Sequence, residues 1–123
     1  MPATYEYEIK NGYAQATTQG TISNMDDVMT YVQSLIEDTN RMDMNNLLLD
    51  HRKVTGDLDT LKSFNFAVKV TNKVVGMRAL RLAIVAHRER MEFLKFFETA
   101  AQNRGMMVVG FDSMEEALRW IKG

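Results

Sequence analysis

Residues Leu80–Lys122 read LRLAIVAHRERMEFLKFFETAAQNRGMMVVGFDSMEEALRWIK, and this stretch decides the fold class. Residues 80–86 are a short apolar run, and residues 89–102 have the spacing of an amphipathic helix. A second apolar run covers 106–111, and a second helical pattern covers 112–122. Apolar strands that alternate with helices are typical of a parallel sheet covered by helices, so the sequence predicts an α/β protein.

The start of the chain predicts a β-hairpin. Tyr5–Ile9 alternates apolar and charged residues, which is the period of a strand with one face in water. The pair Asn11-Gly12 tolerates the positive φ values of a tight turn, and Tyr13–Thr18 forms the returning strand.

The middle of the chain adds a helix, a strand and another helix. Ser23 or Asn24 is the expected cap of the first helix, whose inner face comprises Met25, Val28, Met29, Val32, Leu35 and Ile36. Asn46–Asp50 is a predicted buried strand, residues 53–59 a loop and residues 60–75 a second helix. The full order is ββαβαβαβα, which gives a mixed, mostly parallel sheet with helices mainly on one face.

The helix over residues 89–102 has the widest apolar arc of the chain. Its predicted inner face contains Phe93, Leu94, Phe96, Phe97, Ala100 and Ala101. Gly105 is a natural left-handed cap at its end, and the sequence from Ser113 to Glu116 is a capping box for the last helix.

Size and composition are those of one globular unit. The chain has 123 residues, 46% of them hydrophobic, and a formal net charge of −1. We therefore expect a single domain over 1–123 and no nucleic-acid binding. The absence of cysteine excludes disulfides, zinc–thiolate sites and cysteine nucleophiles. The N-terminus resembles no signal peptide and no apolar run is long enough to span a bilayer, so a cytoplasmic location is expected.

The amino-acid sequence of the C-terminal third resembles that of the STAS superfamily, which has the SpoIIAA-like fold of anti-sigma-factor antagonists. The likeness lies in Phe96-Phe97-Glu98-Thr99, Asn103-Arg104-Gly105 and the segment Phe111–Ile121, FDSMEEALRWI. It is greatest to small stand-alone bacterial STAS-like proteins of unassigned function, and upstream of residue 80 it rests on element order. The resemblance implies helices mainly on one face of the sheet, kinship with CRAL-TRIO lipid-transfer domains and action by binding a partner.

Many STAS proteins are switched by phosphorylation of a serine in an Asp-Ser-Ser-Gly-like loop after the third strand, and this chain departs from that pattern. Residues 50–56 read DHRKVTG and contain no serine. Thr55 before Gly56 is the candidate phosphoacceptor that the resemblance leaves.

Polar residues follow two predicted parallel strands and suggest an anion site. The first group includes His51 and Arg52, and the second includes His87, Arg88 and Arg90. Because ligands gather at the carboxyl ends of parallel strands, these five side chains are the candidate ligands of a small anion. The alternative is a solvated rim in which the arginines pair with nearby carboxylates, and this reading carries the greater weight.

Catalytic and metal chemistry find little support in the sequence. His51, His87 and Asp50 could supply metal ligands, but no HExxH spacing is present. No G-x-S-x-G elbow or glycine-rich phosphate loop occurs either. We therefore expect no enzyme, no cofactor and no metal.

The second predicted helix offers a partner surface. Phe66 and Val70 lie on the side away from its inner face, bordered by Lys62, Lys69 and Lys73. Apolar residues ringed by lysines are typical of a protein or membrane contact, although Phe66 and Val70 could also pack on a neighbouring helix. We favour a protein partner or a homodimer over membrane docking.

The sequence thus predicts a non-catalytic protein-interaction or regulatory module of STAS type, with the loop Asp50–Gly56 as part of the contact surface. The alternative is a CRAL-TRIO-like carrier of a small apolar or lipid ligand. Such a carrier needs an internal cavity of a few hundred Å³, whereas an interaction module needs none.

Overall fold

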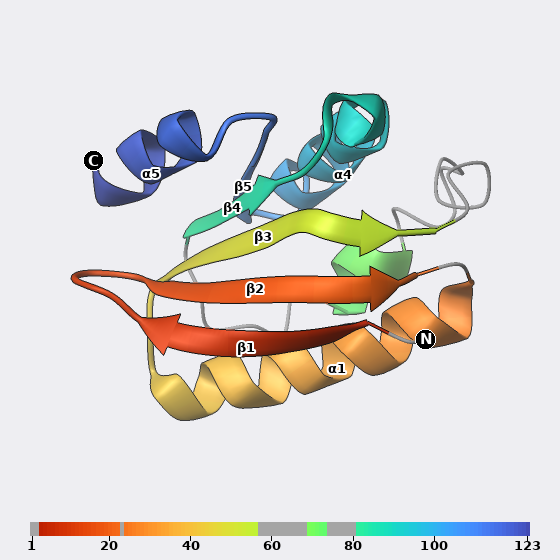
Figure 1. Ribbon diagram of the computed structural model, residues 1–123, viewed down its shortest axis with the longest axis horizontal. Coiled ribbons are helices and arrows are strands. Elements are labelled where there is room, and N and C mark those ends of the chain that lie inside the picture. Colours follow the sequence, from red (N-terminus) through yellow and green to blue (C-terminus); the bar gives the residue numbers. More distant parts are fainter. Residues whose placement is uncertain (1–2, 23, 57–68, 74–80) are drawn as a thin grey trace.

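The computed structural model describes residues 3–22, 24–56, 69–73 and 81–123 (Figure 1). Of the predicted partner surface, Lys62 and Phe66 lie outside these residues. The predicted helix over 60–75 is therefore described only at 69–73, which is helical.

A five-stranded sheet forms the centre of the molecule. The strands are β1 (Thr4–Ile9), β2 (Ala14–Thr21), β3 (Asn46–Thr55), β4 (Arg81–Val85) and β5 (Met107–Phe111), and they lie in the order β1-β2-β3-β4-β5. Only the β1–β2 pair is antiparallel, and β2 to β5 all run in the same direction (Figure 1). The predicted hairpin and the mostly parallel α/β sheet are both confirmed.

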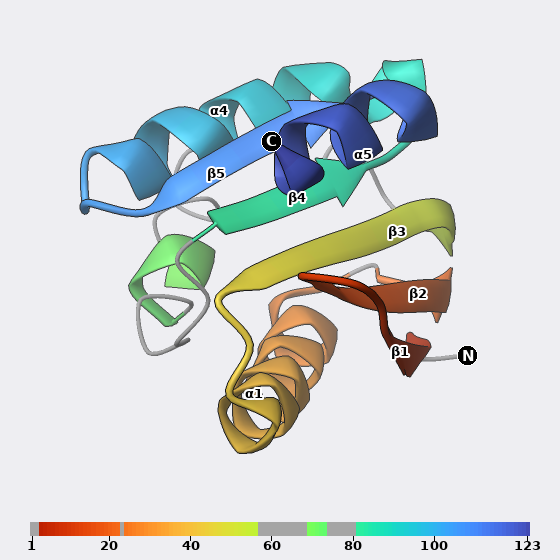
Figure 2. The same cartoon turned by 90° about the vertical axis from the view of Figure 1, so that its left-hand side faces the viewer.

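The helices cover the sheet unequally. Within the described residues these are α1 (Met25–Met42), the short 3₁₀ helix η1 (Arg88–Arg90), α4 (Met91–Gln102) and α5 (Met114–Lys122), and residues 69–73 are helical as well. α1 and α4 pack with residues from 69–73 on one face, and α5 covers the other face over β3, β4 and β5 (Figure 2). Among the described residues, no helix has both the length and the hydropathy needed to cross a membrane.

The central strand β3 is buried on both sides. Leu47 and Leu49 join the core under α1 and α4, whereas Leu48 joins the core under α5. Each of these leucines is at most 5% exposed. Alternate residues of a strand point to opposite faces, so the continuous apolar run LLL is explained by a helix on each side of the sheet.

The helix caps follow the sequence signals. The Asn24 side chain accepts a hydrogen bond of 2.9 Å from the backbone N–H of Asp27, and Ser113 Oγ accepts one of 3.3 Å from that of Glu116. After α4, Gly105 has φ +81°, and the N–H groups of Gly105 and Met106 donate to the carbonyls of Gln102 and Ala101. This arrangement is a Schellman motif, as expected for a glycine at that position.

Two sequence predictions need correction. β3 continues to Thr55, so residues 53–55 belong to a strand and not to a loop, because they pair with β2 from Gln19 to Thr21. Phe96 is 45% exposed and does not face the core. Its neighbour Phe97 fills the core position, since adjacent residues of a helix point about 100° apart.

A bulge interrupts β3 opposite β2. Thr17 pairs with Asp50 and Gln19 with Lys53, so two steps along β2 correspond to three along β3. The extra residue lies at His51–Arg52 and shifts the alternation of side chains by one position. As a result His51 and Val54, which are an odd number of residues apart, line the same cavity on the α1 side of the sheet.

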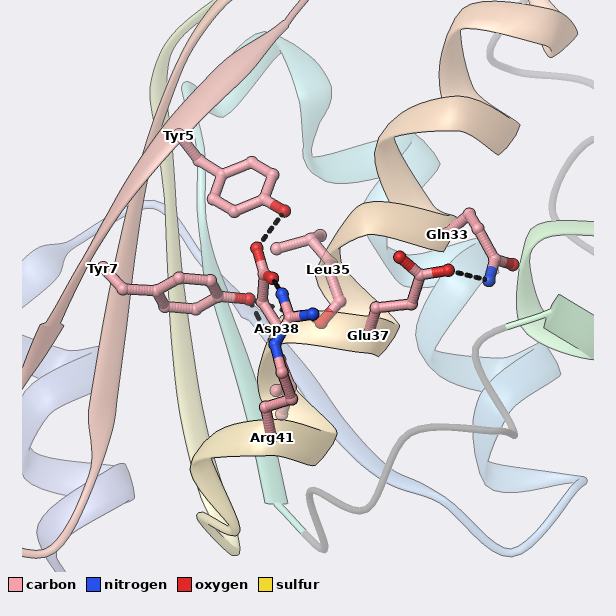
Figure 3. Close-up of polar contacts among 8 residues, drawn as sticks. Tyr5, Tyr7, Gln33, Leu35, Glu37, Asp38 and Arg41 are labelled. Carbon is pink, nitrogen blue, oxygen red and sulfur yellow. Dashed lines mark hydrogen bonds and ion pairs between the residues drawn. The ribbon is translucent and has the colours of Figure 1, made fainter.

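The edge strand β1 is fastened to α1 by two tyrosines (Figure 3). Tyr5 Oη donates a 2.7 Å hydrogen bond to Asp38, which also pairs with Arg41. Tyr7 Oη lies 3.0 Å from Thr39 Oγ1 and donates at 3.3 Å to the Leu35 carbonyl. The two tyrosines of β1 therefore pack against the first helix.

The two adjacent phenylalanines of α4 supply a matched stability test. Phe97→Ala should lower the free energy of unfolding by about 3–5 kcal/mol, because it empties an aromatic core site. Phe96→Ala should change it by no more than about 0.5 kcal/mol, as at most exposed positions. Urea denaturation of both variants measures the difference, and equal losses would contradict the assignment of the two faces.

Candidate functional site

A chain of polar side chains crosses the otherwise apolar interior between α1 and the sheet. Thr18 Oγ1 of β2 lies 2.8 Å from Tyr31 Oη of α1. Tyr31 Oη also lies 2.7 Å from His51 Nε2 of β3. Thr18 and Tyr31 are buried and His51 is partly buried. The Tyr31 hydroxyl therefore serves both neighbours inside the protein, and desolvation raises its pKa.

Arg90 reaches this cluster from the other side. It is the last residue of η1, and it is only 8% exposed although Arg88 and Glu89 before it face solvent. Its Nε atom has no hydrogen-bond partner among the residues the structure describes. Desolvation lowers its pKa, yet a guanidinium remains charged inside proteins, so η1 places a cation in the interior.

Burial and this cation together control the charge of His51. Desolvation of the imidazole, followed by the positive charge of Arg90, lowers the pKa of His51 to about 4 from an ordinary value of 6.5, and Asp50 opposes the shift. At neutral pH His51 is therefore uncharged, and Arg90 supplies the positive charge of the cluster.

The cluster borders a cavity of about 100 Å³. Tyr31, His51 and Arg90 are its polar lining residues, and the remaining described walls are apolar side chains from α1, β3, β4 and α4 together with Ile22 and Val70. Val32, Leu49, Ile84 and Phe97 are representative of these walls. The arrangement is an apolar pocket with one cationic, hydrogen-bonding end, which is the usual design of a small-molecule site.

The five residues predicted to bind an anion separate into two groups. His51 and Arg90 line the cavity. Arg52 turns to Asp50, with which it makes a bidentate pair of 2.9 and 2.8 Å. His87 and Arg88 are exposed, and Arg88 pairs with Asp112 at 3.2 Å. Those pairings follow the alternative reading, in which arginines at the rim neutralise nearby carboxylates.

Sequence reasoning missed Thr18 and Tyr31. A sequence signal existed for Tyr31, since it lies three residues after Val28 and four before Leu35 on the apolar face of α1. No sequence signal distinguished Thr18 from the other threonines of β2. Thr18 is buried because α1 packs over it and places the Tyr31 hydroxyl against its own.

The predicted partner surface stays a prediction, and the structure corrects the placement of one of its residues, Val70. Val70 is 6% exposed and lines the cavity, so it cannot contribute to an exposed patch. Lys69 and Lys73 are exposed, and Lys73 borders a shallow groove formed with Met29 and Gln33 of α1. Val70 faces inward because it belongs to the core that also holds Val32 and Phe97.

Thr55 ends β3 on the surface. Its hydroxyl lies 3.1 Å from Thr21 Oγ1 and donates at 3.4 Å to the Gly20 carbonyl. Gly56 has φ +153°, and a Cβ atom there would lie 1.8 Å from the Ile22 carbonyl oxygen. The chain thus leaves the strand in close contact with β2. A phosphoacceptor role for Thr55 stays a prediction.

No group of three metal-ligating side chains is assembled within the described parts of the chain. His51 binds Tyr31 and Asp50 binds Arg52, so both have other partners in the structure.

Solved structures of the same architecture exist. The chain is similar to an uncharacterised protein of the DUF3478 family with a SpoIIAA-like fold from Shewanella loihica, with 17% identity, a TM-score of 0.59 and coverage of 98% of this chain and 94% of that one. It is also similar to an anti-sigma factor antagonist from Mycobacterium paratuberculosis, with 12% identity, a TM-score of 0.56 and coverage of 98% and 95%. No protein-family model matches the sequence, and no curated protein matches it.

These likenesses define a STAS-like protein fold. The resemblance first seen in residues 80–122 extends over nearly the whole chain, because both neighbours cover 98% of it. The predicted SpoIIAA-like α/β architecture is therefore confirmed.

The low pKa of His51 makes stability depend on pH in a defined direction. An unfolded chain binds a proton on His51 below about pH 6.5, whereas the folded chain resists protonation down to about pH 4. The free energy of unfolding should therefore fall as the pH falls from 7 to 4. Tyr31 and Arg90 face the ring from α1 and η1, and Asp50 precedes it on β3.

Replacement of His51 should flatten this pH dependence. His51→Gln lacks the titrating ring, so its free energy of unfolding should decline less between pH 7 and pH 4 than that of the wild type. His87→Gln removes the exposed histidine and should follow the wild-type curve. Urea denaturation at several pH values measures the three curves, and parallel curves for wild type and His51→Gln would refute the assignment.

Proposed function

We propose that this protein is a non-catalytic regulatory module of STAS type that acts by binding another protein. The observation that carries this proposal is its likeness, over 98% of the chain, to a protein named as an anti-sigma factor antagonist. A protein that antagonises an anti-sigma factor acts through contact with a protein. The same compact scaffold, with exposed loops and helix surfaces, suits the same kind of action here.

The proposed contact surface lies where α1 meets the helical residues 69–73. Lys69 and Lys73 are exposed there, and the groove beside Lys73 is lined by Met29, Thr30, Gln33 and Ser34. The exposed part of Asp50–Gly56 at the end of β3 completes the predicted surface. Its cations make an acidic protein surface the best complement.

A lipid-carrier function stays an alternative prediction. The cavity measures about 100 Å³, which is below the few hundred Å³ that such a carrier was expected to need. The interaction module therefore receives the stronger support from the described interior.

A charge reversal at the proposed surface should abolish partner capture. We expect native cytosol to yield at least one protein retained by the wild-type chain and lost with Lys69→Glu/Lys73→Glu, because an acidic partner would then meet like charge. The matched control is Arg119→Glu/Lys122→Glu, which makes the same charge change on exposed residues of α5. Affinity pull-down with quantitative mass spectrometry compares the three proteins.

Capture of the same proteins by the wild type and both variants, or of none above the bead background, would contradict the proposed surface. Light scattering of the same preparations identifies a second copy as the partner. If the wild-type mass exceeds that of a monomer, and only Lys69→Glu/Lys73→Glu lowers it, the surface is assigned to a homodimer.

A further inference from the structure

Arg90 is a buried cation that forms no direct ion pair with a described carboxylate, and the charge of its exposed neighbour Glu89 offsets only part of the effect of desolvation on its pKa. It is 8% exposed, its Nε donor is unpaired, and among the described residues no carboxylate forms an ion pair with it. Removing a charge from water without pairing it is strongly unfavourable, so such positions are rare in folded proteins. A ligand with negative charge would remove this cost.

The other arginines behave differently. Each described arginine apart from Arg90 has a partner on the protein: Arg41 with Asp38, Arg52 with Asp50, Arg88 with Asp112, Arg119 with Glu115, Arg104 with Asn72, and Arg81 with the Trp120 ring and carbonyl. All of these are more exposed than Arg90. The chain therefore pairs its surface arginines and leaves the buried one open toward the cavity.

The cavity beside Arg90 gives the ligand a second property. Among the described residues, its apolar walls are aliphatic and aromatic and include Leu82, Ile84 and Phe97, and its polar lining residues are Tyr31, His51 and Arg90. A phosphate or a sugar acid would bring more polar atoms than this end can satisfy, and each unsatisfied atom would oppose binding. A monocarboxylate with an apolar chain fits both the cationic end and the apolar walls of the cavity.

Size limits the chain length. An apolar cavity of about 150 Å³ accommodates benzene, with six carbons. The cavity here has about 100 Å³, so it accommodates a chain of fewer carbons than that.

We propose that this cavity is a binding site for a short-chain aliphatic monocarboxylate, whose carboxylate accepts hydrogen bonds from Arg90 and whose chain lies among Leu82, Ile84 and Phe97. The site is internal and uses none of the residues of the proposed partner surface. The two proposals can therefore fail independently.

The probe is sodium pentanoate, followed by ¹⁵N–¹H NMR titration of the full chain. We expect saturable shifts at the amides of His51, Arg90 and Phe97. Acetate lacks the chain and 1-pentanol lacks the charge, so each should bind about tenfold more weakly or worse, the factor expected when an apolar contact or a charged hydrogen bond is lost. Absence of saturable shifts with pentanoate, or equal binding of acetate or pentanol, would overturn the proposal.

Two matched variants test the role of Arg90. Arg90→Met keeps the length of the side chain and removes the charge, so it should lose pentanoate binding by about tenfold or more. Its stability should equal or exceed that of the wild type, because a buried unpaired charge has been removed. Arg88→Met changes an exposed arginine of the same 3₁₀ helix and should bind pentanoate normally. Undiminished binding by Arg90→Met would refute the assignment.

A variant at the apolar end keeps the test decisive if Arg90→Met does not fold. Ala86 lines the cavity and is 3% exposed, so Ala86→Val places two further methyl groups in it. Pentanoate should then bind more weakly while the affinity for acetate, which needs less room, is unchanged. Equal pentanoate affinity in Ala86→Val and wild type would place the ligand elsewhere and overturn the proposal.

Discussion

The pairing of β3 with its two parallel neighbours is the constraint on which the rest of the structure depends. β3 is hydrogen-bonded to β2 on one side and β4 on the other, and its leucines fill both cores. Both faces of β3 therefore need a covering helix, because leucines point to each of them. His51 follows Leu49 by two residues and so points to the same face, and the bulge at His51–Arg52 brings Val54 to that face as well.

That geometry explains why the interior contains both an apolar core and a polar cluster. His51 lies on the α1 side of the sheet, where its Nε2 atom is 2.7 Å from the Tyr31 hydroxyl. The same Tyr31 hydroxyl also contacts Thr18 Oγ1. A neutral imidazole and two hydroxyls satisfy one another without charge, which keeps the cost of their burial low. Arg90 adds a charge to this set, and the proposed carboxylate is the group that would balance it.

The two proposed sites differ in position and in chemistry. The proposed protein contact is polar, basic and on the outside, beside α1 and residues 69–73, whereas the proposed ligand site is internal and mostly apolar. Val70 connects the two, because it lines the cavity while its neighbour Lys69 is exposed. A ligand that fills the cavity would stabilise the packing of this helical segment on α1 and the sheet.

The sequence alone determined the sheet and most helix boundaries, because local periodicity, caps and turn residues specify them: the run 80–86 gave β4, Asn24 and Ser113 the caps, and Gly105 the end of α4. It could not determine which of five polar residues face inward. Arg52 and Arg88 pair with carboxylates at the rim, while His51 and Arg90 line the cavity, and these outcomes depend on the continuation of β3 beyond Asp50 and on a 3₁₀ turn. Only the tertiary structure decided them, because a single-residue shift in a strand or turn reverses the direction of a side chain without changing its hydrophobic pattern.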